Sequence, residues 1–409
     1  MNICLAIISD TWAGAETVAH ELARHLRDRG ENVFIALNRE IYDHYTDLEN
    51  VRLINVGSLF RYTGLINACI SPKVGIDEKQ GPPDSFPGSF YLDAALREIY
   101  YKRIQSPLAQ TMMLNKIDII HSHLNAGIVL ISNLPDDLGI PVVATLHGQS
   151  SADMVKRSRI GWLKSPVGSW RRERLIRSLG KARAITAVSD AELEAVNSCD
   201  IPVKDKSIVI PNGINVSEVQ SNRSSTGLKG EFNLLFPGGA RLVKGGDLII
   251  AALPEVRRVL GGMHLYIAGE VPKNHALREM VAARGLDENV TFTGLLGVQE
   301  YRQMLNSVDL LVMPSREESF GIAFLEAMAL GKPVIGSNRG GVPTVVKDGR
   351  NGVLVEPAPD QIAEAIIYLY RNVEERQEMS RNSLGDVTAF DWGDIVGRYI
   401  ALYREIESG

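Results

Sequence analysis

The sequence predicts an α/β protein with two doubly wound parallel sheets, each in its own domain. Short β-branched runs alternate with helical patterns almost from end to end, which is typical of βαβ units. The alternation pauses in a polar, Ser-rich stretch near residue 220 and then restarts. The length of 409 residues also suits two or three domains better than one.

The first domain is predicted over residues 1–213. "NICLAIISD" reads as its first strand, and "GAETVAHELARHLRDRG" as a helix with Val18, Leu22 and Leu26 on one face and Gly30 as its stop. The later strands are "NVFIALN", "VRLINV", "DIIHSH", "PVVATLH", "AITAVS" and "SIVIPNG". Residues 60–90 contain Gly and Pro without periodicity, so they are predicted as an inserted loop.

The second domain is predicted over residues 214–385, after the linker "SEVQSNRSSTGLKGE". Its strands are "NLLFPGG", "HLYIAGE", "VTFTG", "DLLVMPS", "PVIGSN" and "NGVLVEP", with a helix between most of them. Residues 386–409 form a helix that we expect to cross back onto the N-terminal domain. Its apolar positions at helical spacing are Phe390, Trp392, Ile395, Tyr399 and Tyr403.

Composition narrows the class of protein. A hydrophobic content of 45%, a charged content of 23% and a net charge of −5 are typical of soluble globular proteins and argue against a protein built to bind nucleic acid. Cys4, Cys69 and Cys199 lie far apart, which fits a reducing compartment and no zinc site. Met1 leads directly into an apolar run, so we expect a strand rather than a signal peptide, no spanning helix, and a cytoplasmic location.

The loop "PGGARLVKGG" carries the first candidate site. Arg241 and Lys244 lie three residues apart between glycines, directly after a predicted strand. Ligands of open α/β sheets bind at the carboxyl ends of strands, where glycines let backbone N–H groups approach an anion. The pattern therefore favours a phosphate site over two ordinary solvated cations.

The stretch "SREESFGIAFLEAMALG" predicts a helix that begins near Phe320 or Gly321, with Ser319 as its N-cap. The free backbone N–H groups of Phe320, Gly321 and Ile322 would then suit a diphosphate.

Glu318 and Glu326 flank this helix start. A carboxylate beside an anion is costly unless it accepts hydrogen bonds from neutral donors, and sugar hydroxyls are such donors. Together with the cationic loop, the two acids indicate a nucleotide sugar. They also fit ordinary acids at a helix start, or the carboxylate pair of a glycosidase, although a neutral glycan needs no phosphate loop.

These motifs resemble a known family. "PSREESFGIAFLEAMALGKPVIGSNRGGVP" resembles the Glu-x7-Glu signature of retaining GT-B glycosyltransferases of family 4, and "GGARLVKGG" is similar to their Arg/Lys phosphate loop. "IPNGIN" and "AITAVSD" extend the likeness over nearly the whole chain. The resemblance implies the GT-B architecture, in which two Rossmann-like domains face each other across a cleft, the N-terminal one for the acceptor and the C-terminal one for a nucleotide sugar.

The resemblance also implies roles for individual residues. Arg241 and Lys244 would hold the diphosphate, Glu326 the ribose hydroxyls and Glu318 the transferred sugar near its reacting carbon. His147, at the end of "PVVATLH", would face the sugar and the acceptor. His121 and His123 are candidate acceptor-side residues on a different ground, because they also lie at a predicted strand end. The implied donor-binding set is Gly14, Gly239, Arg241, Lys244, Ser319, Phe320, Gly321, Ile322 and Glu326; the implied catalytic set is Glu318, His147, Arg241 and Lys244.

The chain departs from the family pattern at three positions. Ala13 replaces one glycine of the loop after the first strand, which weakens the expectation for Gly14, and Asn215 and Thr344 replace acidic residues. None of these changes alters a charge assigned to catalysis.

The expected reaction is retaining transfer of a sugar from a UDP- or GDP-sugar to a hydroxyl of a glycan, lipid-linked or small-molecule acceptor, in cell-surface polysaccharide or glycolipid synthesis. The resemblance implies front-face internal return. No D-x-D motif follows a strand, so neither an essential divalent metal nor a cofactor is expected. The alternatives are a non-catalytic nucleotide-sugar-binding protein and a nucleotide-sugar epimerase, which would need a set of strand-end acids and histidines that the sequence lacks.

The segment Lys156 to Arg183 holds ten basic residues against the single acid Glu173, with Trp162 and Trp170 interleaved. Such a segment can lie on the inner face of an anionic membrane and present a lipid-linked acceptor. A solvated basic helix face explains it equally well, whereas the acidic net charge disfavours nucleic acid.

Overall fold

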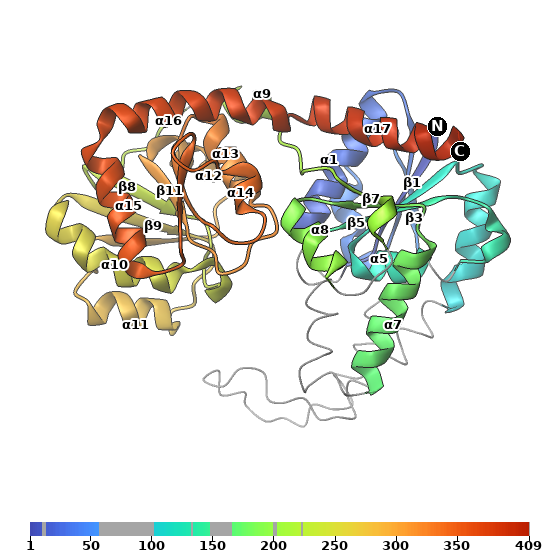
Figure 1. Cartoon of the computed structure of the whole chain (residues 1–409), viewed down its shortest axis with the longest axis horizontal. Helices are drawn as coiled ribbons and strands as arrows, with labels where there is room; N and C mark the ends of the chain where they lie inside the picture. The colour runs from blue at the N-terminus through green and yellow to red at the C-terminus, as the bar shows by residue number, and fades with distance from the viewer. Residues whose placement is uncertain are drawn as a thin grey trace. The chain divides into compact units, whose positions relative to one another are not determined.

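The protein is described by a computed structural model that covers residues 1–9, 14–56, 102–131, 134–147, 166–198, 203–221 and 224–408. The chain forms two compact units (Figure 1). The first contains Met1–Val188, Glu192–Ile210 and Val396–Gly409; the second contains Ser189–Ala191 and Pro211–Ile395. Each unit holds one all-parallel sheet flanked by helices, which confirms the predicted fold class. The predicted loop at 60–90 lies outside the described residues.

The first unit contains a seven-stranded sheet in the order β3-β2-β1-β4-β5-β6-β7. Its strands are β1 (Asn2–Ile7), β2 (Asn32–Leu37), β3 (Arg52–Asn55), β4 (Ile119–His123), β5 (Val142–Leu146), β6 (Ala184–Ala187) and β7 (Ser207–Val209). Its helices include α1 (Gly14–Asp28), α2 (Arg39–Tyr42), residues 102–114, α5 (Leu124–Ile131), α7 (Pro166–Lys181) and α8 (Asp190–Asn197), with single turns η1 (Asp43–Tyr45), η2 (Asp136–Leu138) and η5 (Lys204–Lys206).

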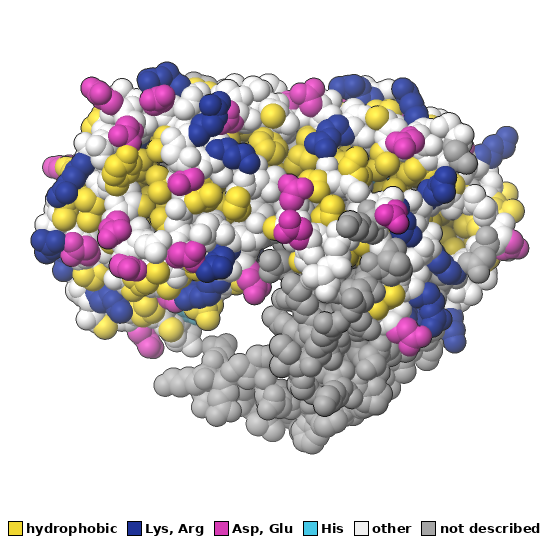
Figure 2. Space-filling view, viewed as in Figure 1, with side chains coloured by type: hydrophobic (Ala, Val, Ile, Leu, Met, Phe, Trp, Pro, Cys, Tyr) yellow, Lys and Arg dark blue, Asp and Glu magenta, His cyan; other side chains and the backbone are white. Residues whose placement is uncertain are grey.

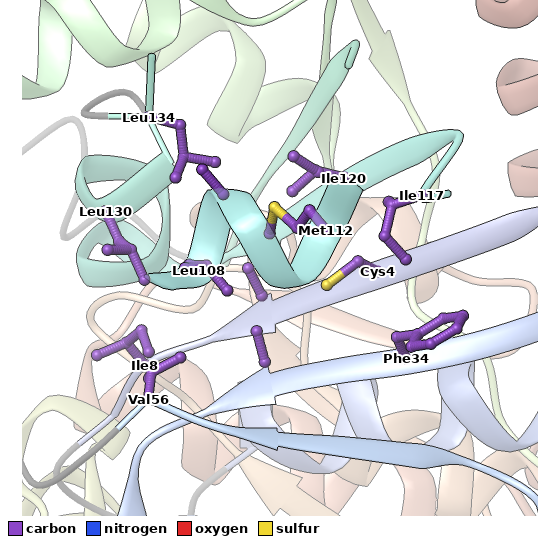
Figure 3. Close-up of a cluster of buried hydrophobic side chains, with 13 residues drawn as sticks. Cys4, Ile8, Phe34, Val56, Leu108, Met112, Ile117, Ile120, Leu130 and Leu134 are labelled. Carbon is purple, nitrogen blue, oxygen red and sulfur yellow. The ribbon is translucent and has the colours of Figure 1, made fainter. Parts of the chain in front are cut away.

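The central strands are buried on both faces because helices cover the sheet, so they read as continuous apolar runs. In Figure 3, Leu108 and Met112 of the helix at 102–114 point toward Cys4 of β1 and Ile120 of β4. Cys4 is therefore packed as a small hydrophobe in the core, and burial raises the pKa of its thiol to about 12.

The second unit contains a six-stranded sheet in the order β10-β9-β8-β11-β12-β13. Its strands are β8 (Phe232–Phe236), β9 (Met263–Ala268), β10 (Val290–Gly294), β11 (Leu310–Met313), β12 (Val334–Ser337) and β13 (Gly352–Val355). Its helices are α9 (Val216–Ser221), η6 (Leu242–Lys244), α10 (Gly246–Val259), α11 (Ala276–Ala283), α12 (Val298–Ser307), α13 (Ile322–Ala329), α14 (Val342–Val345), α15 (Pro359–Arg371), α16 (Val373–Asp386) and η7 (Val387–Phe390).

The predicted linker is partly wrong. Its first residues form α9, where Val219 is buried and Gln220 Nε2 donates to the carbonyl of Ala329 in α13 at 3.0 Å. A single buried side chain in a six-residue helix is too weak a pattern to detect in a polar sequence.

The C-terminal segment forms α17 (Trp392–Ser408), whose first turn groups with the second unit and whose remainder groups with the first. Trp392 packs on Gly213, where a Cβ atom would come within 2.4 Å of the indole ring, so only glycine fits. Tyr399 and Tyr403 are also buried, as their helical spacing predicts.

The described surface is of mixed charge. On the face shown in Figure 2, Lys and Arg side chains lie among Asp and Glu side chains over most of the described area. No helix among the described residues is long and apolar enough to cross a membrane.

Candidate functional site

The strand order of the second unit locates a crevice. The chain runs from β8 outward through β9 to β10, and then returns to β11 on the other side of β8. Adjacent loops leave the sheet in opposite directions at such a switch point, so the space above the carboxyl ends of β8 and β11 is open to a ligand. The two loops that follow these strands contain Arg241 and Lys244, and Glu318, respectively.

Glycines bring the loop after β8 close to its neighbours. Gly239 has φ +54°, and its N–H donates to the carbonyl of Ala268 at 3.0 Å. Gly245 has φ +83°, and a Cβ atom there would lie 2.4 Å from the carbonyl oxygen of Pro314. Both positions therefore require glycine. Arg241 begins the η6 turn with an exposed side chain, whose Nε donates to the carbonyl of Gly238 at 3.4 Å.

Lys244 and Glu318 form a direct ion pair. Lys244 Nζ donates to Glu318 Oε2 at 2.6 Å, and the two side chains are only 16% and 11% exposed. The sequence-based reading gave them to different parts of a ligand, whereas the fold brings them together at the switch point. The carboxylate holds the ammonium group in place, so the cation can meet an arriving anion without reorganisation.

Arg316 links the same two loops, and sequence analysis missed it. Its guanidinium binds both carboxylate oxygens of Asp247 at 2.8 and 2.6 Å. It also donates to the carbonyl of Leu242 at 2.7 Å, while its backbone N–H donates to Val243 at 2.8 Å. Bidentate Arg–carboxylate pairs fix geometry as well as charge. Only the position of Arg316 directly after a strand could have suggested this role.

A glycine pair supports the loop from the other side. The N–H of Gly341 donates to the carbonyl of Glu318 at 2.8 Å. A Cβ atom at Gly340 would lie 2.1 Å from that oxygen, and one at Gly341 would lie 1.9 Å from the carbonyl oxygen of Ser319. Any side chain at either position would displace the backbone that carries Glu318.

The start of α13 differs from the prediction. The N-cap is Gly321, in the left-handed region at φ +92°, and no side-chain cap hydrogen bond is made, so Ser319 is not the N-cap. Glycine is favoured because the chain must turn sharply between the loop and the helix. Phe320 is 2% exposed and packs edge-on to Phe390, so only its backbone can face a ligand. Ile322 opens the helix and is half-buried.

Glu326 lies in the second turn of α13 and is half-buried. Burial raises the pKa of its carboxyl to about 7, against the opposing effects of the Arg302 charge and the Tyr301 hydroxyl from α12. Arg302 is itself held by Glu218 at 3.0 Å. A carboxyl with a pKa near neutrality is typical of functional sites.

The carboxyl edge of the first sheet carries the three histidines. β1 pairs with β4 so that Ile7 lies beside His123, and β4 pairs with β5 so that His123 lies beside Thr145. His121 and His123 are fully buried, whereas His147 follows the end of β5 and is half-buried. His123 Nδ1 lies 2.8 Å from His147 Nε2. The structure therefore brings together the three histidines that the sequence singled out.

Burial keeps these imidazoles uncharged. It lowers the pKa of His121 to about 3 and that of His147 to about 4, and it lowers the pKa of His123 well below its ordinary value. At neutral pH all three rings are neutral and can only donate or accept hydrogen bonds. The part of the chain that the structure describes holds no group of three or more His, Cys, Asp or Glu arranged to bind a metal ion.

Two further predictions concern Gly14 and the basic segment Lys156–Arg183. Gly14 begins α1 and is exposed, and a Cβ atom built there meets no heavy atom of the described chain within 4 Å, so packing gives no reason for glycine. Residues 156–165 of the basic segment lie outside the described residues. Within the described part of α7, Arg177 is exposed and pairs with Glu173 at 2.7 Å.

The comparisons with known proteins cover both units. Residues 12–218 match the family description "Glycosyltransferase Family 4", and residues 218–385 match "Glycosyl transferases group 1". The chain is 30% identical over 305 residues to a D-inositol 3-phosphate glycosyltransferase of Paenarthrobacter aurescens, covering 72% of this chain and 74% of that protein. It is 26% identical to an alpha-D-kanosaminyltransferase of Streptomyces kanamyceticus, covering 66% and 72%.

Solved structures agree on the fold. Anabaena HepE in complex with UDP superposes with a TM-score of 0.73 at 18% identity, covering 99% of this chain and 100% of that one. Sucrose-phosphate synthase of Thermosynechococcus elongatus gives a TM-score of 0.70 at 19% identity, covering 100% and 99%. With both halves of the chain matched, this protein belongs to glycosyltransferase family 4 and is a GT-B glycosyltransferase.

Proposed function

We propose that the protein is a retaining glycosyltransferase that moves a sugar from a nucleoside-diphosphate sugar, UDP- or GDP-linked, to a hydroxyl of an acceptor. The acceptor would be a glycan, a lipid-linked molecule or a small molecule in the synthesis of cell-surface polysaccharide or glycolipid. No cofactor and no essential divalent metal are proposed.

The observation that carries the proposal is the Lys244–Glu318 pair at the β8/β11 switch point, with Arg241 in the same loop. As the bond to a diphosphate leaving group breaks, negative charge grows on the phosphate oxygens. Lys244 and Arg241 can offset this charge from fixed positions, which is the largest contribution that many enzymes make to catalysis. Glu318 would accept hydrogen bonds from the sugar, and Glu326 from the ribose.

Names of similar proteins support the donor class. Structures of Anabaena HepE are described in complex with UDP and with UDP-glucose. The curated relatives are named for transfer to an inositol phosphate and for transfer of kanosamine. These names are compatible with a nucleotide-sugar donor and with more than one acceptor class.

The proposed chemistry is a front-face displacement. The bond between the anomeric carbon and the phosphate oxygen breaks, and the bond to the acceptor oxygen forms on the same face. The acceptor proton passes to the departing phosphate oxygen. In this scheme His147 orients hydroxyl groups and does not need to take the proton, in keeping with the low pKa that burial gives it.

The basic segment Lys156–Arg183 is proposed to hold the protein on an anionic membrane surface. Retention on vesicles that contain anionic lipid, lost at high salt and absent with neutral vesicles, would support this role. Equal recovery in the unbound fraction with both kinds of vesicle would exclude it.

The test of the main proposal is to incubate the full chain with UDP-, GDP- and ADP-sugars and to measure the released nucleoside diphosphate, with and without EDTA. Arg241→Ala with Lys244→Ala should lower the rate by at least about 10³-fold. Arg257→Ala with Arg258→Ala, two cations on α10, is the matched control and should keep it. The anomeric configuration of the product tests retention.

Three outcomes would contradict the proposal. Binding without turnover would make the protein a nucleotide-sugar-binding protein, and loss of activity in EDTA would exclude the metal-free scheme. Full activity of the Arg241/Lys244 double variant would exclude the assigned site.

A further inference from the structure

The three histidines of the first sheet are in contact with one another. The His123 and His147 rings are stacked, with centroids 5.1 Å apart and 23° between their planes. The His121 and His123 rings lie 4.1 Å apart, since residues two apart on a strand share a face. The 2.8 Å separation of His123 Nδ1 and His147 Nε2 is a hydrogen bond, and one of the two nitrogens must carry its proton.

The surroundings of His123 decide which nitrogen that is. Its other nitrogen, Nε2, is buried and has no hydrogen-bond partner in the described chain. If His147 were the donor, neutral His123 would carry its own proton on Nε2, and a buried N–H without an acceptor is strongly unfavourable. If His123 donates from Nδ1, Nε2 keeps only a lone pair, and an unpaired acceptor is tolerated better than an unpaired donor.

We infer that His123 is a positioning residue that donates its Nδ1 proton to His147 and thereby fixes His147 as the tautomer protonated on Nδ1. His147 then presents an N–H donor through its Nδ1, and its Nε2 is already occupied as an acceptor. The half-buried ring can therefore hold the oxygen of a substrate hydroxyl, but it cannot take a proton on Nε2 while the bond to His123 is intact. The identity of that substrate rests on the proposed function; the tautomer does not.

The His123 ring is also held in place by its contact with the His121 ring. The His121 ring packs against it at a tilt of 38°. The two nitrogens of His121 lie 2.5 Å from the Tyr403 hydroxyl of α17 and 2.5 Å from Thr145 Oγ1 of β5. Reorienting His123 would disturb this buried network. The low pKa values that burial causes in all three rings are consistent with neutral tautomers, because a charged ring would carry protons on both nitrogens.

The direct test is NMR of the full chain labelled with ¹⁵N-histidine, in which long-range ¹H–¹⁵N correlations identify the protonated nitrogen of each ring. His147→Gln assigns the His147 signals. In the wild type we expect His147 to be protonated on Nδ1 only, unchanged from pH 6 to pH 8. A His147 protonated on Nε2, or on both nitrogens, would overturn the inference.

Two variants separate positioning from packing. His123→Asn places an amide donor near the position of Nδ1 and should keep the tautomer of His147, whereas His123→Leu removes the donor and should release it. For turnover, His123→Leu should lower kcat roughly 10²-fold with little change in the KM for the donor, and His123→Asn should restore most of it. If His123→Asn and His123→Leu both fold and give the same His147 tautomer and the same kcat, the inference is also overturned.

The two hypotheses can fail separately. The tautomer is measured without any substrate, so absence of glycosyl transfer would count against the proposed function alone. An Nε2-protonated His147 in an active enzyme would count against the positioning role alone.

Discussion

The carboxyl edges of the two sheets have the same topology and opposite chemistry. In both, the first strand lies beside a strand from the second half of the domain, β1 beside β4 and β8 beside β11. The edge of the second sheet carries the ion pairs Lys244–Glu318 and Arg316–Asp247. The edge of the first carries three imidazoles that burial keeps neutral.

The two edges therefore share the topology that forms a crevice and differ in the side chains that line it. The switch point provides a crevice in either domain. The charges of Lys244, Glu318, Arg316 and Asp247 persist in the second unit because they are paired, which offsets the cost of removing them from water. The first unit avoids that cost by holding neutral polar rings. An edge with fixed cations suits an anionic leaving group, and an edge of neutral donors and acceptors suits hydroxyls.

The largest effect is expected from breaking the charged edge. Lys244→Met should lower kcat by roughly 10²–10³-fold, because one of the two cations proposed to offset the leaving group would be lost. It should also lower the free energy of unfolding by roughly 3–5 kcal/mol, since Glu318 stays largely buried without its partner. Enzyme assays and chemical denaturation measure the two effects.

A double variant separates the two effects of Lys244. Lys244→Met with Glu318→Gln should regain most of the stability and none of the turnover. Arg258→Met, which breaks the exposed Arg258–Glu255 pair on α10, is the control and should change neither. Recovery of turnover in the double variant would show that the cation has no role in the chemistry.

The next effect should come from loosening the charged edge while leaving the Lys244 and Glu318 side chains in place. Arg316→Ala removes the link to Asp247 and Leu242, so the loops that carry Lys244 and Glu318 lose their register, and kcat should fall roughly 10–100-fold. Arg316→Lys should not restore it, because lysine lacks the planar fork. Arg350→Ala, which breaks the similar Arg350–Asp386 pair, is the matched control. Equal kinetics of the Arg316 and Arg350 variants would refute the role of Arg316.

The pKa of Glu326 predicts a pH dependence that the first sheet lacks. In the proposed role of Glu326, ribose hydroxyls would donate to the ionised carboxylate, so affinity for a nucleotide sugar should rise roughly fivefold to tenfold from pH 6 to pH 8, across the pKa of about 7. Glu326→Gln should flatten this profile, and Glu255→Gln should not. Titration calorimetry at several pH values measures it, and a flat wild-type profile would contradict the assigned role.

The same shift has a consequence for folding. Between pH 4.5, the ordinary pKa of the carboxyl, and about pH 7, the folded state binds more protons at Glu326 than the unfolded state does. The contribution of Glu326 to stability is therefore complete below pH 4.5 and is lost as pH rises to 7. In Glu326→Gln this component of the pH profile should disappear.

The smallest effect on turnover is expected from Tyr403, which contacts the neutral edge through His121. Tyr403→Phe removes the hydroxyl that His121 Nδ1 contacts and should cost about 1–3 kcal/mol of stability, because a buried polar group loses its partner. The His123–His147 bond is left intact, so kcat should stay within about threefold. Thermal unfolding and kinetics measure this, with the exposed Tyr368→Phe as control. A kcat loss as large as that of His123→Leu would show that Tyr403 acts on the site directly.

Much of the fold could be read from the sequence because strands buried on both faces are continuous apolar runs. Each of the thirteen strands that lie within the described residues, from "NICLAI" to "NGVLV", was predicted in the right place. The predicted N-cap of α13 was wrong, because the backbone conformation outweighed the capping preference of the residue type. Ser319 is a good N-cap by residue type, but the backbone is left-handed at Gly321, which is the N-cap, and α13 begins at Ile322.

The sequence by itself determined the succession of strands and helices along the chain and the residue types at the strand ends, since both follow from local periodicity and spacing. Only the tertiary structure decided which of those residues meet. The Lys244–Glu318 bond joins residues 74 positions apart and the Tyr403–His121 bond joins residues 282 positions apart. Such pairings depend on the strand order and on where the last helix docks, and no local pattern encodes the distance between two loops of a folded sheet.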